Sequence, residues 1–202
     1  MLDIVMPEKL ELVLQINHRV DKNGYHLLTN PRDFSANECY SYLKKNKWPW
    51  LYAGLLIKYN NIFWNAQYNK EKNVVRFNID YPAMSLEWVL SFIKAINSPG
   101  KWIKFEYSER CSAKMTYTES QNAILISDNS SHVANRPTLQ IDRVKFANML
   151  LVFTTEMIGY TSAILLSLNQ DDEKISPRFK KELERAINFQ LWQEVNEKLK
   201  II

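Results

Sequence analysis

Glycine is scarce in this chain, which contains only four glycines among its 202 residues. That is about 2%, against roughly 7% in an average protein. Loops that cradle phosphate groups, and folds that bind dinucleotides, need several glycines at fixed spacing. The scarcity therefore argues against nucleotide-binding classes of enzyme.

Cysteine is also rare, and neither sign of charge dominates. Cys39 and Cys111 lie 72 positions apart, so the chain has no C-x-x-C metal motif and too few thiols for a disulfide framework. Lys and Arg number 26 against 22 Asp and Glu, which leaves a net charge of +4. The N-terminus has neither the basic segment nor the long apolar stretch of a signal peptide. We therefore expect a cytoplasmic, reducing location.

The longest nearly uncharged run covers residues 146–169. Its hydroxyl and amide side chains, together with Glu156, make it too polar for a typical membrane span. We expect a buried core helix there and no membrane span. Hydrophobic residues make up 46% of the chain and aromatic residues 12%, which is enough to build a core.

The first half of the chain has the patterns of strands followed by helices. Apolar and polar residues alternate over 10–16, which predicts a strand that turns at 21–24 and returns over 25–28. Ser35 and Glu38 predict a capping box for a helix over 36–46. A three-stranded meander is expected next, followed by a helix that Ser85 caps and that Ser98-Pro-Gly100 ends. The meander strands are expected at 50–59, 62–68 and 74–79, and the helix at 86–97.

The second half repeats this plan. A second meander is expected over 101–108, 113–118 and 123–128, followed by a polar loop over 129–137. Asp142 predicts the cap of a helix that Gly159 ends or bends. Ser176-Pro177 predicts the start of a helix of about 22 residues. The apolar residues of this last helix recur every four positions and predict one buried face: Phe179, Leu183, Ile187, Leu191 and Val195.

These elements predict an α+β fold in a single domain, residues 1–202. Its antiparallel sheet is formed by successive meanders, its helices pack on one face, and a long amphipathic helix ends the chain. No Pro/Gly/Ser-rich linker divides the sequence.

The titratable residues form no convincing catalytic or metal-binding pattern. His18 and His26 lie on opposite strands of the predicted hairpin, but no Asp, Glu or Cys lies at a spacing that completes a zinc site. His132 lies in a polar loop whose Asp and Ser match a triad by composition only, because a G-x-S-x-G motif is absent. Cys39 is expected to be packed inside a helix and Cys111 to be exposed at a strand turn beside Arg110, with no histidine nearby in the sequence to activate either thiol. We expect a protein that is not an enzyme and binds neither metal nor cofactor.

A carboxylate cluster also precedes the predicted C-terminal helix. Asp171, Asp172 and Glu173 lie just before its first turn, where negative charge favours the helix dipole. We expect these three residues to have that structural role.

The most distinctive surface candidate lies where the first helix leads into the next strand. Lys44, Lys45, Lys47, Trp48 and Trp50 occur within seven positions. Residues 44–76 contain seven basic side chains and one acidic side chain. Lysines interleaved with aromatic residues are typical of a surface that binds an acidic protein or a single-stranded nucleic acid. The alternative is a solvated turn with both tryptophans in the core.

Two segments resemble known proteins. Ser85-Leu-Glu-Trp-Val-Leu-Ser-Phe-Ile-Lys-Ala-Ile-Asn97 is similar to the helix that follows a strand meander in small bacterial toxin-immunity proteins. Leu139-Gln-Ile-Asp-Arg-Val-Lys-Phe-Ala-Asn-Met-Leu-Leu-Val-Phe153 resembles their later pattern, in which a strand leads directly into a helix. The resemblance covers about a third of the chain.

This resemblance implies a non-catalytic, cytoplasmic interaction protein of bacterial competition. It would bind a cognate toxin, whose surface should be acidic because this chain is basic. Two alternatives remain open from the sequence. One is a nucleic-acid-binding or regulatory module, and the other is an enzyme whose site is assembled from scattered residues.

Overall fold

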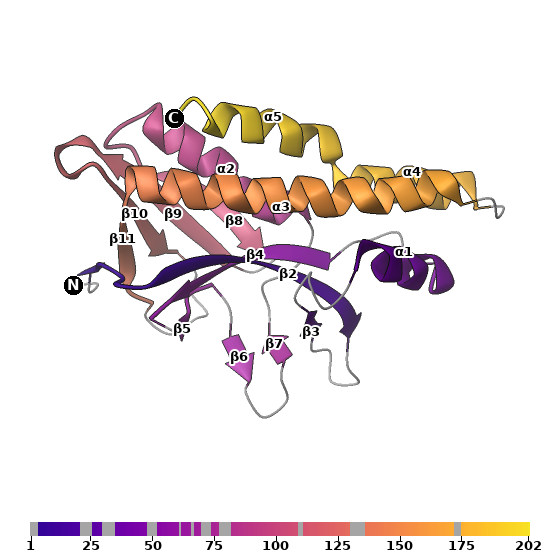
Figure 1. Ribbon diagram of the computed structural model, residues 1–202. Coiled ribbons are helices and arrows are strands. Elements are labelled where there is room, and N and C mark those ends of the chain that lie inside the picture. The colour runs from indigo at the N-terminus through magenta and orange to yellow at the C-terminus, as the bar shows by residue number, and fades with distance from the viewer. Residues whose placement is uncertain are drawn as a thin grey trace.

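The computed structural model describes residues 4–20, 26–29, 35–47, 52–60, 62–65, 67–69, 74–76, 82–108, 111–129, 136–171 and 175–202. Its α+β class is the one that the sequence predicts. Figure 1 shows two β-sheets on one side and a layer of helices on the other, with the helices running across both sheets. The structure thus divides the predicted sheet into two.

The first sheet has five strands in the order β1-β11-β10-β9-β8. The predicted second meander is confirmed as antiparallel β8 (Ile103–Ser108), β9 (Cys111–Thr118) and β10 (Ala123–Asp128). A short 3-10 turn, Glu119–Gln121, connects β9 to β10 and ends at Asn122. The backbone of Asn122 is left-handed, a conformation that asparagine tolerates well. β11 (Thr138–Asp142) continues the antiparallel order, and β1 (Ile4–Val5) adds a parallel edge.

The second sheet has six strands in the order β5-β4-β2-β3-β7-β6. The predicted first hairpin is confirmed by β2 (Leu10–Val20) and β3 (His26–Thr29), which pair antiparallel. The pairing register shifts between Asn17 and Arg19, so His18 lies at an irregularity in the pairing. The predicted turn at 21–24 lies outside the described residues.

The predicted first meander is wrong in its middle strand. Instead of one strand over 62–68, β5 (Ile62–Phe63) pairs with β4 (Tyr52–Tyr59), and β6 (Gln67–Asn69) pairs with β7 (Val74–Arg76). Buried Asn65 accounts for the interruption. Its Oδ1 accepts from the Ile57 N–H and its Nδ2 donates to the Leu55 carbonyl, both at 2.7 Å. One side chain thus replaces a strand partner along β4.

The helical layer contains α2 (Pro82–Ile96) and α3 (Arg143–Gln170) over the sheets, with α4 (Pro177–Ile187) and α5 (Phe189–Leu199) beside them (Figure 1). α1 (Ala36–Lys45) packs against α3 at one end of the molecule. The predicted cap at Ser85 is wrong, because α2 begins at Pro82. Ser85 is buried inside the helix, where its hydroxyl accepts from the Leu55 N–H at 3.0 Å.

The other helices lie closer to where the sequence predicts them. Asp142 caps α3 by accepting from the Lys145 N–H at 2.8 Å, and the helix continues through Gly159 for 28 residues. The C-terminal region is helical and amphipathic as expected, with one break at Asn188, whose backbone is left-handed. The five apolar residues of the predicted face are all buried or half-buried.

α3 is long and apolar enough to cross a membrane by length and composition alone. An 18-residue window has a mean hydropathy of 1.6, and 33% of that window is buried. The core helix of a soluble protein meets the same criteria, and α3 packs against strands of both sheets. The absence of a membrane span therefore stays a prediction.

An aromatic cluster joins the two sheets beneath α2. Trp88 of α2 lies edge-on to Trp64 and to Phe105 of β8, with ring centroids 6.0 Å and 4.8 Å away. Tyr107 of β8 also contacts both tryptophans. Such pairs contribute beyond the area that they bury, so this cluster holds the sheets together.

Arg136 covers one side of the aromatic cluster. Its guanidinium lies 5.8 Å from the centre of the Trp64 ring and donates a hydrogen bond to the Tyr107 hydroxyl. The same group pairs with the Asp128 carboxylate at 3.6 Å, and both side chains are more than nine-tenths buried. Trp64 in turn donates to the Pro137 carbonyl at 2.8 Å. This buried ion pair connects β10 to the aromatic cluster.

Candidate functional site

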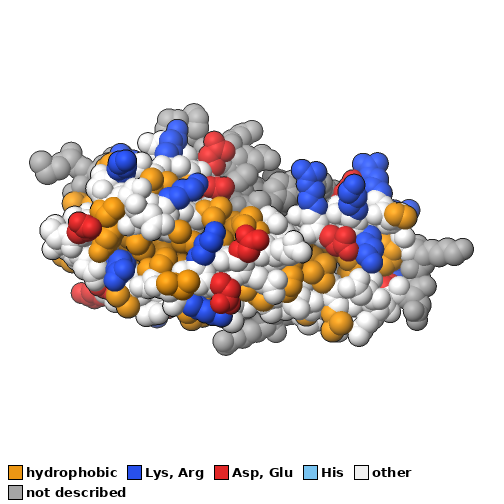
Figure 2. Space-filling view, turned by 90° about the horizontal axis from the view of Figure 1, so that it is seen from above, with side chains coloured by type: hydrophobic (Ala, Val, Ile, Leu, Met, Phe, Trp, Pro, Cys, Tyr) orange, Lys and Arg blue, Asp and Glu red, His pale blue; other side chains and the backbone are white. Residues whose placement is uncertain are grey.

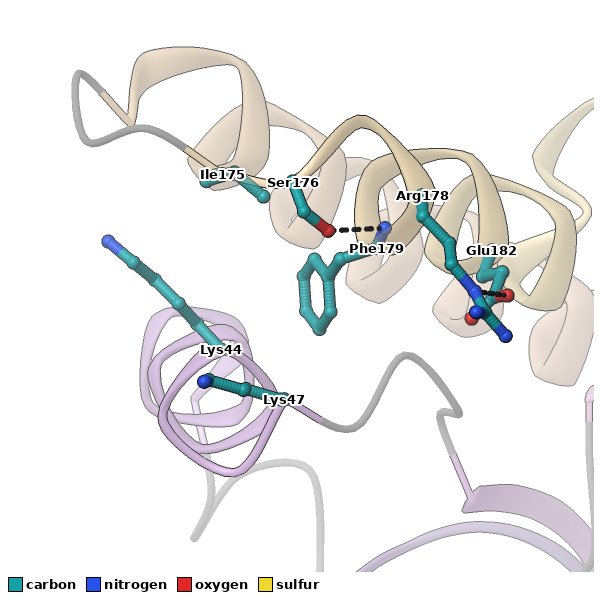
Figure 3. Close-up of a pocket in the computed structure, with 7 residues that line it drawn as sticks. All are labelled: Lys44, Lys47, Ile175, Ser176, Arg178, Phe179 and Glu182. Atoms are coloured by element: carbon teal, nitrogen blue, oxygen red, sulfur yellow. Dashed lines mark hydrogen bonds and ion pairs between the residues drawn. The ribbon is translucent and has the colours of Figure 1, made fainter.

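A pocket of about 570 Å³ opens between the end of α1 and the start of α4. Figure 3 shows Lys44 and Lys47 on the α1 side, and the ring of Phe179 reaching from α4 toward them. Arg178 and Glu182 lie on the α4 side. The described lining combines three cations and one carboxylate with two apolar side chains and a serine: Lys44, Lys47, Ile175, Ser176, Arg178, Phe179 and Glu182.

The start of α1 is set by the predicted capping box. Ser35 Oγ accepts from the Glu38 N–H at 3.3 Å, and the Glu38 carboxylate accepts from the Ser35 N–H at 2.9 Å. Hydrogen bonds from the side chain and backbone of Ser35 hold the pKa of Glu38 below its ordinary value. This local motif fixes where α1 begins, and with it the position of its last turn.

Contacts with α3 hold α1 in place. Cys39 is buried as predicted, with its thiol hydrogen-bonded to Tyr160 of α3. Burial raises the pKa of Cys39 to about 12, despite the opposing effect of that hydrogen bond. The thiol therefore stays protonated at neutral pH and is a poor nucleophile. Ser167 of α3 also donates to the Asn37 amide oxygen at 2.6 Å.

Lys44 forms an ion pair at the C-terminal end of α3. Its ammonium donates to the Asp171 carboxylate at 2.6 Å, and the Tyr40 hydroxyl donates to the same oxygen at 2.7 Å. The expected role of Asp171 at the start of the following helix is therefore wrong. Asp171 follows the last turn of α3, where it joins this helix to α1. Asp172 and Glu173 lie outside the described residues.

Lys47 has an unusual backbone conformation for its residue type. Its φ is +52°, in the left-handed region where glycine or asparagine normally follows a helix end. Three other non-glycine residues with positive φ are described, and all are asparagines: Asn60, Asn122 and Asn188. No carboxylate among the described residues forms an ion pair with Lys47. An exposed lysine therefore occupies a position that favours other residue types.

The start of α4 forms the opposite wall. Ser176 Oγ accepts from the Phe179 N–H at 3.1 Å, and Pro177 occupies the first helical position, as predicted. Arg178 pairs with Glu182 one turn later at 2.8 Å, and this hydrogen bond raises the pKa of the guanidinium. Arg178 is 87% exposed. Because exposed pairs of this kind contribute little stability, Arg178 can exchange Glu182 for another carboxylate at low cost.

The pocket lies within a basic end of the molecule. Figure 2 shows Lys and Arg side chains gathered at the end of the helical face where α4 lies. We call this area, together with the last turn of α1, the basic end. The exposed cations described there are Lys45, Lys47, Arg178, Lys180, Lys181 and Arg185.

The structure thus brings part of the predicted binding segment into the pocket. Lys44 and Lys47 line it, whereas Lys45 is exposed beside it. Trp48 and Trp50 lie outside the described residues. Sequence reasoning did not assign Arg178 to any site and placed Phe179 on a buried helix face, because both lie more than 130 positions from Lys44 along the chain. Their one local signal was the strong helix start at Ser176-Pro177.

The remaining chemical candidates do not converge on the pocket. Cys111 was predicted to be exposed, but it is buried in β9, where the strand packs onto the core. His132 lies outside the described residues, as do the side chains of His18 and His26. Within the described ranges, no three His, Cys, Asp or Glu side chains lie close enough together to hold a metal ion.

Lys47→Gly should give a more stable protein than Lys47→Ala, by about 1 kcal/mol, because only glycine adopts positive φ without a steric cost. Urea unfolding of the two variants measures this difference. Equal stability of the two variants would show that the left-handed backbone at residue 47 is not strained.

Comparison of the chain with protein families, with curated proteins and with solved structures found no match.

Proposed function

We propose that this chain is a non-catalytic binding protein, an immunity protein that binds and neutralises a cognate bacterial toxin in the cytoplasm. Its basic end contacts an acidic surface of the toxin. The observation that carries the proposal is the pocket between α1 and α4, where Lys47 and Arg178 flank the apolar residue Phe179.

This arrangement of charge and apolar surface is typical of a protein interface. Ile175 and Phe179 are half-buried in the lining, together with the exposed cations Lys47 and Arg178. Protein interfaces commonly combine an apolar centre with a polar rim, and arginine is enriched in them. Opposite charge on the partner speeds its association and rejects partners of the wrong sign.

A protein partner fits this pocket better than a nucleic acid. Single-stranded nucleic acids bind through aromatic rings with an open face on which bases stack. The Phe179 ring is half-buried and reaches from α4 toward α1. The described pocket therefore suits an inserted protein side chain better than a stacked nucleic-acid base.

The experiment is co-expression in a bacterial host with the protein encoded by the neighbouring gene, because immunity and toxin genes are expected side by side. That neighbour should arrest growth when it is expressed alone, and this chain should restore growth. A neighbour that leaves growth unaffected, or an arrest that the chain does not relieve, would contradict the immunity function.

A further inference from the structure

We infer that the pocket between α1 and α4 receives one acidic and apolar segment of the partner protein, with an apolar side chain against Phe179 and carboxylates against Lys47 and Arg178. The inference rests on the proposed function, because it assigns the chemistry of the partner at the same site. The occupant of the pocket is a protein segment, not a phosphate or a nucleic acid.

The size and the lining of the pocket support an inserted segment. Its volume of about 570 Å³ lies within the range of pockets that enclose a small ligand, and it exceeds what one aliphatic side chain fills. Ile175 and Phe179 give it apolar surface, and cations line it on the α1 side and on the α4 side. A side chain that enters the pocket therefore places its neighbours beside positive charge.

The cations differ in what they can offer a partner. Lys44 already donates to Asp171, and this contact fixes it as part of the wall. Arg178 is exposed, and among the described residues its ion-pair partner is Glu182, one helical turn away. Lys47 is exposed, and no described carboxylate lies within ion-pair distance of it. Lys47 and Arg178 are therefore the two groups that a carboxylate from the partner meets.

The backbone at Lys47 agrees with this assignment. At a helix end with positive φ, glycine and asparagine have a lower steric cost than lysine. At every other described non-glycine position with positive φ, the chain has asparagine. Lysine at this one position retains a positive charge at the edge of the pocket.

The test is a titration of the ¹⁵N-labelled full chain with three blocked pentapeptides. The peptide EDLED carries both the carboxylates and the apolar side chain, QNLQN replaces each carboxylate by its amide, and EDGED removes the apolar side chain. EDLED should shift the amide signals of residues 44–47 and 175–182 in a saturable way. QNLQN and EDGED should bind at least about tenfold more weakly, because each lacks one of the two contacts.

Matched variants assign the effect to the pocket. Lys47→Asn combined with Arg178→Gln removes both pocket charges and should weaken EDLED binding by about tenfold, given the modest strength of exposed charge pairs. Asparagine at residue 47 keeps a residue that accepts positive φ. Lys94→Gln combined with Lys145→Gln removes the same charge from exposed positions on α2 and α3, outside the basic end, and should change binding by less than about threefold.

Several results would overturn the inference. They are an absence of shifts at the pocket, equal binding of EDLED and QNLQN, or equal losses in the two double variants. Tighter binding of a short poly-dT oligonucleotide to the same residues would assign the pocket to nucleic acid. A chain that restores growth but does not bind EDLED at the pocket would keep the immunity function and lose this site. Binding of EDLED at the pocket without growth protection would keep this site and contradict the immunity function.

Discussion

Arg136→Met is expected to lower the free energy of unfolding by about 3–5 kcal/mol, because it leaves the buried Asp128 carboxylate without this cation. The substitution also removes the guanidinium from the Trp64 ring and the hydrogen bond to Tyr107. Methionine fills much of the same volume, so the loss of charge outweighs the loss of packing. Urea unfolding, followed by tryptophan fluorescence, measures the change.

The double variant Arg136→Met with Asp128→Leu is the control for this prediction. Replacing a buried ion pair by apolar groups is often nearly neutral, so the double variant should recover more than half of the loss. A single variant that costs less than about 1 kcal/mol would show that water reaches Asp128 and that the pair is not a buried junction.

Leu183→Ala is expected to cost about 2–5 kcal/mol, because Leu183 is fully buried at the centre of α4. This helix forms one wall of the pocket, so its packing also positions Phe179 and Arg178. The same substitution at Leu166 of α3, which is 57% exposed, should cost less than about 0.5 kcal/mol. Comparable losses at the two positions in thermal unfolding would contradict the burial of the α4 face.

Features that depend on neighbouring residues were predicted well from the sequence. The caps of α1, α3 and α4 at Ser35, Asp142 and Ser176 lie where the pattern places them, because each cap bonds a backbone group three residues away. The turn at Asn188 was missed, although Asn is the ordinary non-glycine residue for a left-handed position. The apolar period of four continues across it and favours one unbroken helix.

Features that depend on distant residues were not predictable in this way. Ser85 has the sequence context of a cap, but its hydroxyl bonds Leu55, which lies 30 positions earlier. Asn65 looks like part of a strand, but its side chain occupies the place of a strand partner along β4. In both cases a long-range hydrogen bond outweighs a local preference, and single-sequence patterns do not contain that contact.

The candidate site was half predictable for the same reason. The local excess of lysine marked Lys44 and Lys47 at the end of α1. The opposite wall, with Arg178 and Phe179, reaches them only because α3 is 28 residues long and returns the chain to α1. The ion pair between Lys44 and Asp171 also changes how the site is tested. Reversing Lys44 would place a carboxylate beside Asp171 and disturb packing as well as binding.

The most direct test of the basic end is the association rate of this chain with its proposed partner, the protein encoded by the neighbouring gene, measured across a range of ionic strength. Lys45→Glu combined with Lys47→Glu leaves Lys44 in place and reverses two exposed charges. Association should become at least about tenfold slower and less sensitive to added salt, because attraction between opposite charges is lost. Thermal stability should be almost unchanged. An unchanged rate with the same dependence on salt would contradict binding through the basic end.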